Sequence, residues 1–248
     1  MDNVLLYTIG SSVSCQYASA LLERAKIALT DHPSPEITHL LLDVPSFDAD
    51  GLLRDGTDLK ALLRMLPKST TIIGGNLNPE YLQDYRKIDL LQDPCYLAKN
   101  AAITAECALR AAAPYLRTTF ADSPALILGW GRIGKILAKL LMTMGCPVTV
   151  AARKESDRAM LMALGYKAVE FFQIPKIVCQ YKLLFNTVPD LPLHIDTKRI
   201  TAIDLASYPG MNGSDVIPAK GLPGKYAPES SGKLIADTIL RMYQEGVL

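Results

Sequence analysis

The stretch ALILGWGRIGKILAKLLMTMGCPVTVAARKE, residues 125–155, decides the fold of this chain. It opens with a short apolar run, passes through three closely spaced glycines, and continues into a segment whose apolar side chains recur at helical spacing. A second apolar run, PVTVAA, follows that segment. A strand, a tight turn, a helix and another strand in this order predict a βαβ unit with two parallel strands.

The turn itself, GWGRIG at residues 129–134, has the spacing G-x-G-x-x-G. Gly129 permits a tight turn, Gly131 lets the backbone approach a pyrophosphate, and Gly134 lets the helix pack closely on the strand. The first N–H groups of the helix are unpaired and favour phosphate. The pattern therefore predicts a dinucleotide site that also involves Trp130, Arg132 and Ile133, although a turn that only saves space would show the same glycines.

The residues after the second strand bear on which dinucleotide is bound. Sites selective for NAD carry Asp or Glu about 20 residues after the glycines, where it binds the ribose 2′-hydroxyl. Here Ala151 and Ala152 are followed by Arg153 and Lys154. Because a guanidinium pairs well with a phosphate, we expect NADP rather than NAD. The alternative is that both cations belong to a solvated helix start.

Strand-like and helix-like segments alternate along all 248 residues, which predicts an α/β protein with mostly parallel sheets. The alternation breaks at TTFADSPA, residues 118–125, so we place a domain boundary there and expect domains at 1–118 and 119–248. A helix expected at 228–245 could pack back on the first domain. Helices are also expected at 11–30 and 100–116.

Composition narrows the function further. The formal net charge is +1, so no strong field favours nucleic acid or an anionic membrane. The opening residues lack the features of a signal peptide, and no apolar run is long enough to span a bilayer, so we expect a cytoplasmic protein. Five widely spaced cysteines and three histidines show no metal-ligand spacing, and we expect no metal.

Two further turns follow apolar strands of the second half. LLFNTVPD ends in Asn186, Thr187, Val188 and Pro189, and AIDLASYPG continues into Ser207 and Gly210. Ligands of doubly wound sheets bind at the carboxyl ends of strands, so we expect the 186–189 turn on the nicotinamide side of the cofactor. The alternative for each is a simple turn or cap, which the succession of such turns at strand ends makes weaker.

Several segments together resemble the A subunit of dipicolinate synthase. They are GWGRIG followed by AARK, NTVP, DLASYPG and GLPGKYAPESSG in the second half, with LLLDVPSFDADG (40–51) and NAAITAECAL (100–109) in the first. The resemblance begins near residue 36, and a family-like Gly-Gly-Asp-x-Arg is replaced here by residues 10–14, GSSVS. The most specific part is also distantly similar to alanine dehydrogenases and transhydrogenases.

This resemblance implies a flavodoxin-like N-terminal domain, a Rossmann domain, and NADP-linked oxidation of dihydrodipicolinate to dipicolinate, the spore-core chelator. It also implies that the partner is a flavoprotein-like B subunit; a homo-oligomer stays open. A small dicarboxylate needs hydrogen-bond donors and a base. We select Ser46, Thr104, Ser207 and Gly210 for substrate binding, and Glu106 and Asp204 as candidate catalytic carboxylates. Glu106 could instead be a first-turn helix residue, and Asp204 could anchor a loop.

Two other functions remain. A 2-hydroxyacid dehydrogenase, or an alanine dehydrogenase-like enzyme, is the nearest enzymatic alternative. The former would need an Arg and a His–carboxylate pair, and the second half holds only His194. A dinucleotide-binding sensor or scaffold without catalysis is the non-enzymatic alternative, and the altered first loop would suit it.

Overall fold

The computed structural model describes residues 4–48, 50–189, 197, 200–206, 210–211 and 215–248. The chain forms two compact units, one of Met1–Asn100 with Ala227–Leu248 and the other of Ala101–Tyr226. The division lies within helix α3 (Pro94–Ala112), earlier than the expected boundary near residue 118. The last helix, α8 (Pro228–Gln244), belongs to the first unit.

The first unit contains a sheet of five parallel strands. They are β1 (Leu5–Thr8), β2 (Ala28–Thr30), β3 (His39–Leu41), β4 (Thr71–Gly74) and β5 (Lys87–Asp89). Their spatial order is β2-β1-β3-β4-β5, and every neighbouring pair is parallel. This is the flavodoxin-like order, so the expected fold of the first domain is confirmed.

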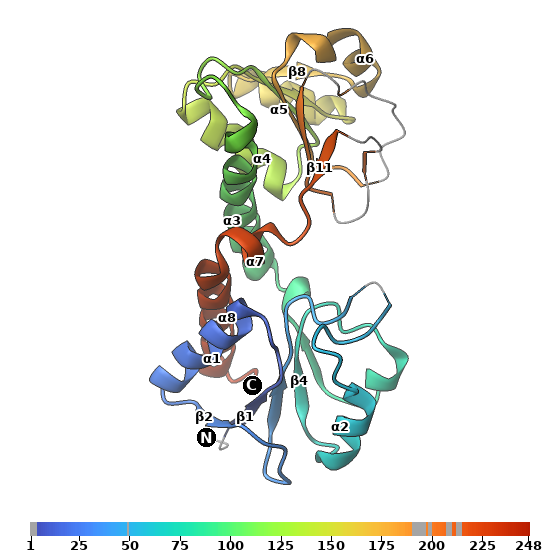
Figure 1. Ribbon diagram of the computed structural model, residues 1–248, viewed down its shortest axis with the longest axis vertical. Helices are drawn as coiled ribbons and strands as arrows, with labels where there is room; N and C mark the ends of the chain where they lie inside the picture. Colours follow the sequence, from blue (N-terminus) through green and yellow to red (C-terminus); the bar gives the residue numbers. More distant parts are fainter. Residues whose placement is uncertain (1–3, 49, 190–196, 198–199, 207–209, 212–214) are drawn as a thin grey trace. The chain divides into compact units, whose positions relative to one another are not determined.

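Helices cover both faces of this sheet (Figure 1): α1 (Val13–Arg24) and α8 lie on one side and α2 (Leu59–Met65) on the other. Short 3-10 helices, η1 (Glu80–Leu82) and η2 (Leu90–Gln92), flank β5. The core beside α2 is aliphatic; it includes Leu40, Leu42, Leu59, Leu63 and Ile72. The central strands β3 and β4 are buried along their whole length, as expected for strands of a parallel sheet covered on both faces.

Close approach of α8 to α1 depends on one glycine. A Cβ on Gly232 would lie 2.4 Å from the carbonyl oxygen of Ser14 and 2.9 Å from Cβ of Tyr17. No side chain larger than hydrogen fits there without moving the backbone of α1. The GLPGKYAPESSG segment thus contains a packing requirement of the first unit.

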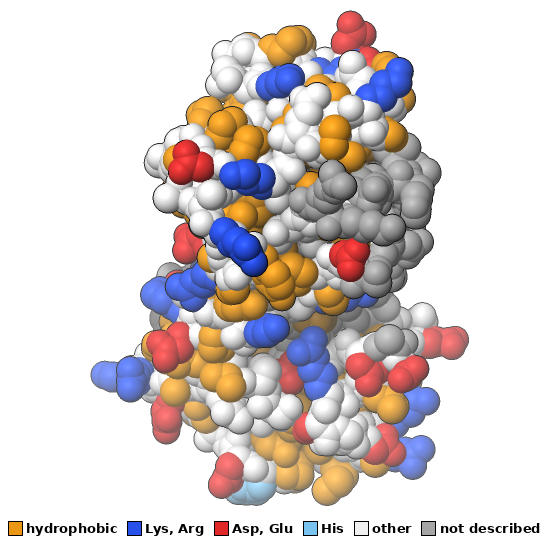
Figure 2. Space-filling view, turned by 45° about the horizontal axis from the view of Figure 1, so that its top comes forward, with side chains coloured by type: hydrophobic (Ala, Val, Ile, Leu, Met, Phe, Trp, Pro, Cys, Tyr) orange, Lys and Arg blue, Asp and Glu red, His pale blue; other side chains and the backbone are white. Residues whose placement is uncertain are grey.

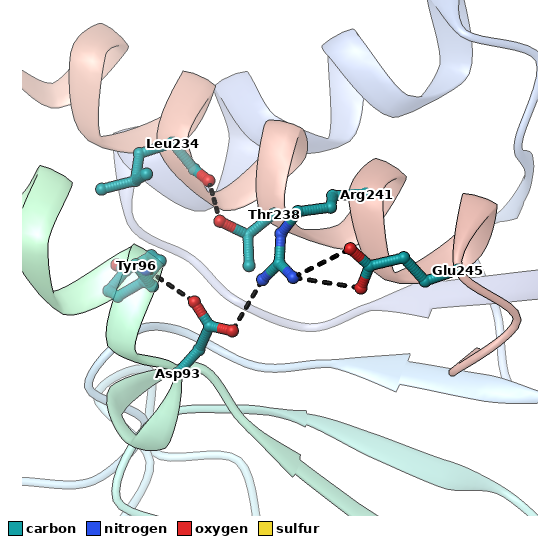
Figure 3. Close-up of polar contacts among 6 residues, drawn as sticks. All are labelled: Asp93, Tyr96, Leu234, Thr238, Arg241 and Glu245. Atoms are coloured by element: carbon teal, nitrogen blue, oxygen red, sulfur yellow. Dashed lines mark hydrogen bonds and ion pairs between the residues drawn. The ribbon is translucent and has the colours of Figure 1, made fainter.

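A polar cluster fastens α8 to the start of α3 within the first unit (Figure 3). Nη2 of Arg241 donates to Oδ2 of Asp93 at 2.6 Å, and Nη1 donates to Oε2 of Glu245 at 3.1 Å. Oδ1 of Asp93 accepts from the Tyr96 backbone N–H at 2.6 Å, so Asp93 also caps α3. Burial raises the pKa of the Asp93 carboxyl, but the Tyr96 N–H and the Arg241 guanidinium outweigh burial and leave that pKa below its usual range.

The second unit contains a sheet of six parallel strands. They are β6 (Ala125–Leu128), β7 (Val148–Ala151), β8 (Lys167–Val169), β9 (Leu183–Asn186), β10 (Thr201–Asp204) and β11 (Val216–Pro218). The order β11-β10-β9-β6-β7-β8 corresponds to 6-5-4-1-2-3 within the unit. This is the Rossmann order, and the prediction of a doubly wound second domain is confirmed.

Among the described residues of this unit, a helix follows each of β6, β7, β8 and β11. These helices are α4 (Arg132–Thr143), α5 (Glu155–Ala163), α6 (Ile174–Ile177) and α7 (Leu222–Tyr226), with 3-10 helices η3 (Ala113–Tyr115), η4 (Phe171–Gln173) and η5 (Val178–Gln180). Leu126 and Leu128 of β6 pack with Ile174 and other residues in one core. Because strand side chains alternate between faces, Ala125 and Ile127 point to the opposite face.

Some element predictions were wrong. Residues 11–30 form not one helix but α1 followed by β2, because Lys26 adopts a left-handed backbone (φ 66°) that ends the helix. Helix α3 begins at Pro94, six residues before the expected start at residue 100. The short strands β8 and β11 went unpredicted, since three residues carry too little periodicity.

Candidate functional site

The glycine turn follows β6 and begins α4, and its three glycines differ in what surrounds them. Gly129 has φ 101°, and a Cβ there would lie 2.5 Å from Oγ1 of Thr187. A Cβ on Gly134 would lie 2.3 Å from the Gly129 carbonyl oxygen. Both glycines are therefore required by the fold itself.

Gly131 is different. A Cβ at this position would have no protein atom within 4 Å, and its backbone (φ −81°, ψ −169°) is an extended conformation open to any residue. Neither packing nor backbone geometry within the described residues requires glycine here. The open space suits the close approach of an external group to the backbone, which is the role expected for the second glycine of the pattern.

The beginning of α4 is suited to an anion. Gly131 is the N-cap and supplies no side-chain hydrogen bond, and the first turn contains no acidic residue. The first N–H groups of the helix are thus left for a ligand or water, with the positive end of the helix dipole behind them. Arg132 is exposed at the first helical position, and Ile133 is half-buried.

Trp130 lies between Gly129 and Gly131 in the turn. Its ring contacts Tyr166 edge to face, with centroids 5.7 Å apart, and the Lys135 ammonium lies 5.7 Å from the Trp130 ring centroid. Trp130 is the sole tryptophan of the chain, so its fluorescence reports on this turn alone. The side chain is half-buried.

The turn after β7, which we call the basic turn (Ala152–Lys154), carries exposed Arg153 and Lys154. Lys154 is the N-cap of α5 without a side-chain cap bond. Arg158, one turn into α5, donates from Nη1 to the carbonyl oxygens of Ala152 (3.0 Å) and Arg153 (2.7 Å). Sequence reasoning missed Arg158, although its position five residues after Arg153 could have suggested a contact back to the turn.

The turn after β9 is held by its own first residue. The Asn186 side chain is fully buried; Nδ2 donates to the Val188 carbonyl oxygen at 2.9 Å, and Oδ1 accepts from the Val188 N–H at 3.0 Å. Thr187 Oγ1 donates to the Leu128 carbonyl oxygen at 2.7 Å, and Pro189 is exposed. This turn and the glycine turn therefore lie at the carboxyl ends of adjacent strands, β9 and β6, and Thr187 bonds the last residue of β6.

Asp204, at the end of β10, is buried and accepts four hydrogen bonds from residues that the structure describes. Oδ1 accepts from Asn186 Nδ2 (2.8 Å) and the Ala206 N–H (3.2 Å), and Oδ2 accepts from the N–H groups of Gly210 (2.9 Å) and Met211 (3.2 Å). A carboxylate has about four acceptor positions, and all are used here. This arrangement favours the anchoring role, and Gly210 is needed because a Cβ there would lie 2.2 Å from Asn186 Nδ2.

Thr104 and Glu106 lie in the middle of α3, not in its first turn. The alternative that Glu106 is a first-turn residue is wrong, because Asp93 and Pro94 form the N-cap and first position of the helix. The N-terminus of α3 therefore does not support substrate at Glu106. Thr104 is buried and Glu106 is exposed.

Ser46 belongs to the first unit and is fully buried. Its Oγ donates to the Asp43 carbonyl oxygen at 2.8 Å and accepts from the Gly75 N–H at 3.0 Å. The hydroxyl thereby joins the loops after β3 and β4. Ser207, the remaining residue selected for substrate binding, and His194 lie outside the described residues.

Asp43 occupies the N-terminus of α1, between the carboxyl ends of adjacent β1 and β3. It accepts from the N–H groups of Ser11 (3.2 Å) and Ser12 (3.1 Å) and from the Ser12 hydroxyl. Burial raises the pKa of the neighbouring Cys15 thiol to about 12, and the Asp43 charge adds to that rise. The chain's own carboxylate thus takes the position where this fold offers N–H groups to an anion.

Searches for other kinds of site gave two further observations. Among the described residues, no group of three or more His, Cys, Asp or Glu side chains is arranged to hold a metal ion. No helix in the described part of the chain combines the length and apolar character needed to cross a membrane.

Comparison with known proteins adds to this geometry. No family model matches the chain. Over 159 residues it is 26% identical to the A subunit of dipicolinate synthase from Bacillus subtilis (strain 168), an alignment that covers 59% of this chain and 54%, about half, of that protein. The chain is similar to the A subunit of dipicolinate synthase. The resemblance stated from the sequence motifs is thereby confirmed.

Solved structures extend the similarity to the whole fold. The dipicolinate synthase A subunit from Bacillus halodurans matches with a TM-score of 0.82 at 18% identity, over 97% of this chain and 98% of that one. A transhydrogenase from Sinorhizobium meliloti matches with a TM-score of 0.69 at 10% identity, over 98% and 94% of the two chains. At such identities the likeness establishes the fold alone.

Proposed function

We propose that this protein binds NADP and oxidises dihydrodipicolinate to dipicolinate, as the name of its relative suggests. The observation that carries the proposal is the open space at Gly131, beside an α4 N-terminus that no side chain of the described residues caps. A fold that needs Gly129 and Gly134 for packing but not Gly131 supports a ligand at the middle glycine.

Three groups of residues would hold the dinucleotide. The glycine turn and the first N–H groups of α4 suit the pyrophosphate, and the basic turn suits the 2′-phosphate through Arg153 and Lys154. The 186–189 turn, adjacent to the glycine turn across β6 and β9, suits the nicotinamide end. When bound, the nicotinamide supplies a hydride acceptor.

The side chains of this protein then need to accept only one proton. Conversion of a dihydropyridine dicarboxylate into the aromatic ring removes one hydride and one proton, and aromatisation itself favours the product. We assign the proton to Glu106, which is exposed in α3, and treat Asp204 as the anchor of the 204–211 loop. Thr104, Ser207 and Gly210 stay the proposed substrate contacts; Ser46 would act by fixing its loop.

One observation favours a different substrate or no catalysis. Asp43 accepts from the N–H groups of Ser11 and Ser12 at the start of α1, within residues 10–14, where the related family carries Gly-Gly-Asp-x-Arg. A carboxylate of the substrate would be repelled there. An NAD(P)-dependent dehydrogenase of the 2-hydroxyacid or alanine type, or a dinucleotide-binding sensor, is therefore the second candidate. The first proposal still includes a homo-oligomer and a flavoprotein-like B subunit.

The test is a titration with NADPH and NADH followed by Trp130 fluorescence, and then a dihydrodipicolinate turnover assay with and without a B-type subunit. Saturable quenching with tighter NADPH binding, together with formation of dipicolinate, is the expected result. Glu106→Gln should reduce turnover without changing NADPH affinity. Binding without turnover in either assay would favour the second candidate, and no binding of either nucleotide would refute the proposal.

A further inference from the structure

Arg158 is the most extensively bonded cation near the glycine turn. Its side chain is only 16% exposed, although it lies on α5 at the surface of the unit. Nη1 donates to two successive carbonyl oxygens of the basic turn, and Nη2 donates to Oε1 of Glu170 at 2.7 Å. One guanidinium therefore ties the turn after β7 to the residue that follows β8.

The partner of Arg158 is itself fixed. Glu170 is the N-cap of η4, and its backbone N–H donates to Gln173 Oε1 at 2.9 Å in a capping box. The Glu170 side chain is 44% exposed and follows the strand next to β7. An uncompensated carboxylate at this point would oppose a phosphate bound at the basic turn.

Positive and negative side chains around the basic turn are balanced in number, so the ion pair between Arg158 and Glu170 affects how the turn would receive a phosphate. Arg153 and Lys154 are followed at once by Glu155 and Asp157 in the first turn of α5. Figure 2 shows the same mixture of Lys or Arg and Asp or Glu side chains over the visible surface of the chain. A preference for a phosphate here depends on how the cations are oriented, because their number alone gives no excess.

We infer that Arg158 is a positioning residue for cofactor choice: it holds the basic turn so that Arg153 and Lys154 meet the 2′-phosphate, and it neutralises Glu170. This inference rests on the proposed NADP function. Arg158 acts through the protein, since its guanidinium is bonded to the carbonyl oxygens of Ala152 and Arg153 and to the carboxylate of Glu170. Its effect should fall on the 2′-phosphate, which NADPH carries and NADH lacks.

The experiment measures dissociation constants of NADPH and NADH for the full chain by Trp130 fluorescence and by calorimetry. Arg158→Met should lower the ratio of NADPH to NADH affinity about tenfold, with NADH affinity nearly unchanged. Arg158→Lys retains the charge but cannot make all three bonds, so an intermediate ratio is expected. Glu170→Gln should keep or raise the ratio, since its amide oxygen still accepts from Arg158.

The double variant Arg158→Met/Glu170→Gln separates the two effects. This variant should recover part of the lost ratio of NADPH to NADH affinity. The Glu170 carboxylate no longer opposes the 2′-phosphate, but the basic turn still lacks its bonds to Arg158. Circular dichroism and thermal unfolding of each variant check that the fold persists. If Arg158→Met does not fold, the ratio of NADPH to NADH affinity in Arg158→Lys tests the inference.

The outcomes distinguish this inference from the function on which it rests. A wild-type chain that binds neither nucleotide, or prefers NADH, overturns the NADP proposal and the role of Arg158 with it. A wild-type chain that prefers NADPH, with Arg158 variants that weaken both nucleotides equally or not at all, overturns the role of Arg158 alone.

Discussion

Substitution of Gly131 by alanine separates a glycine kept for a ligand from glycines kept for the fold. The added methyl group would have no protein atom within 4 Å, and the backbone is already in a conformation that alanine adopts. Alanine is a poorer N-cap than glycine, which lowers stability by several tenths of a kcal/mol. Alanine also restricts the unfolded chain, which raises stability by about 0.4–1 kcal/mol. The free energy of unfolding should therefore change by less than about 0.5 kcal/mol.

Dinucleotide binding should respond very differently. The methyl group would lie where a pyrophosphate approaches the backbone, and one extra methyl in a close-packed contact costs about 1–3 kcal/mol. That corresponds to a loss of affinity of about 5-fold to 150-fold. Calorimetric titration with NADPH measures the loss independently of Trp130, whose neighbouring residue is altered.

Gly134→Ala is the matched control. Its Cβ would lie 2.3 Å from the Gly129 carbonyl oxygen, so the helix must shift. Overpacking of about 1–3 kcal/mol outweighs the gain of about 1 kcal/mol in helix propensity. We expect lower stability in urea unfolding for Gly134→Ala and unchanged stability for Gly131→Ala. Full NADPH affinity in Gly131→Ala would refute the assignment of the turn to a pyrophosphate.

Four further outcomes are expected. Asp93→Ala should destabilise the chain by about 1–2 kcal/mol at pH 7 through loss of the α3 cap. Because the folded-state pKa of Asp93 is lowered, the difference in unfolding free energy between the variant and the wild type, measured in urea, should shrink as the pH falls below about 4. Burial, together with the charge of Arg86, lowers the pKa of His39 in the folded state. The neutral imidazole therefore favours folding above about pH 6.5, and this contribution to stability is lost at lower pH. His39→Leu should flatten the decline in stability that thermal unfolding shows between about pH 6.5 and 5. Gly232→Ala should cost about 1–2 kcal/mol in urea unfolding, whereas Gly224→Ala, whose Cβ would have nothing within 4 Å, should cost little. Arg153→Ala should weaken NADPH about tenfold and leave NADH binding unchanged in fluorescence titrations, and equal weakening of both would contradict the 2′-phosphate assignment.

The sequence by itself determined the parts of this protein that depend on local pattern. The strand, glycine turn and helix of residues 125–144 were predicted because apolar periodicity and three glycines act within a single βαβ unit. The doubly wound class followed from the alternation of segments, and the motif resemblance identified a similar family. Stretches such as GWGRIG carry this information in neighbouring residues, so no distant contact was needed to interpret them.

Only the tertiary structure decided which residues are bonded across the chain. Asp204 and Gly210 are six residues apart, yet the loop-anchoring arrangement required Asn186 from the neighbouring strand. Arg158 and Glu170 meet because β7 and β8 are neighbours, and α8 joins the first unit because Arg241 bonds Asp93 and Gly232 admits the backbone of α1. These contacts depend on the closeness of surfaces far apart in sequence, which residue spacing does not encode.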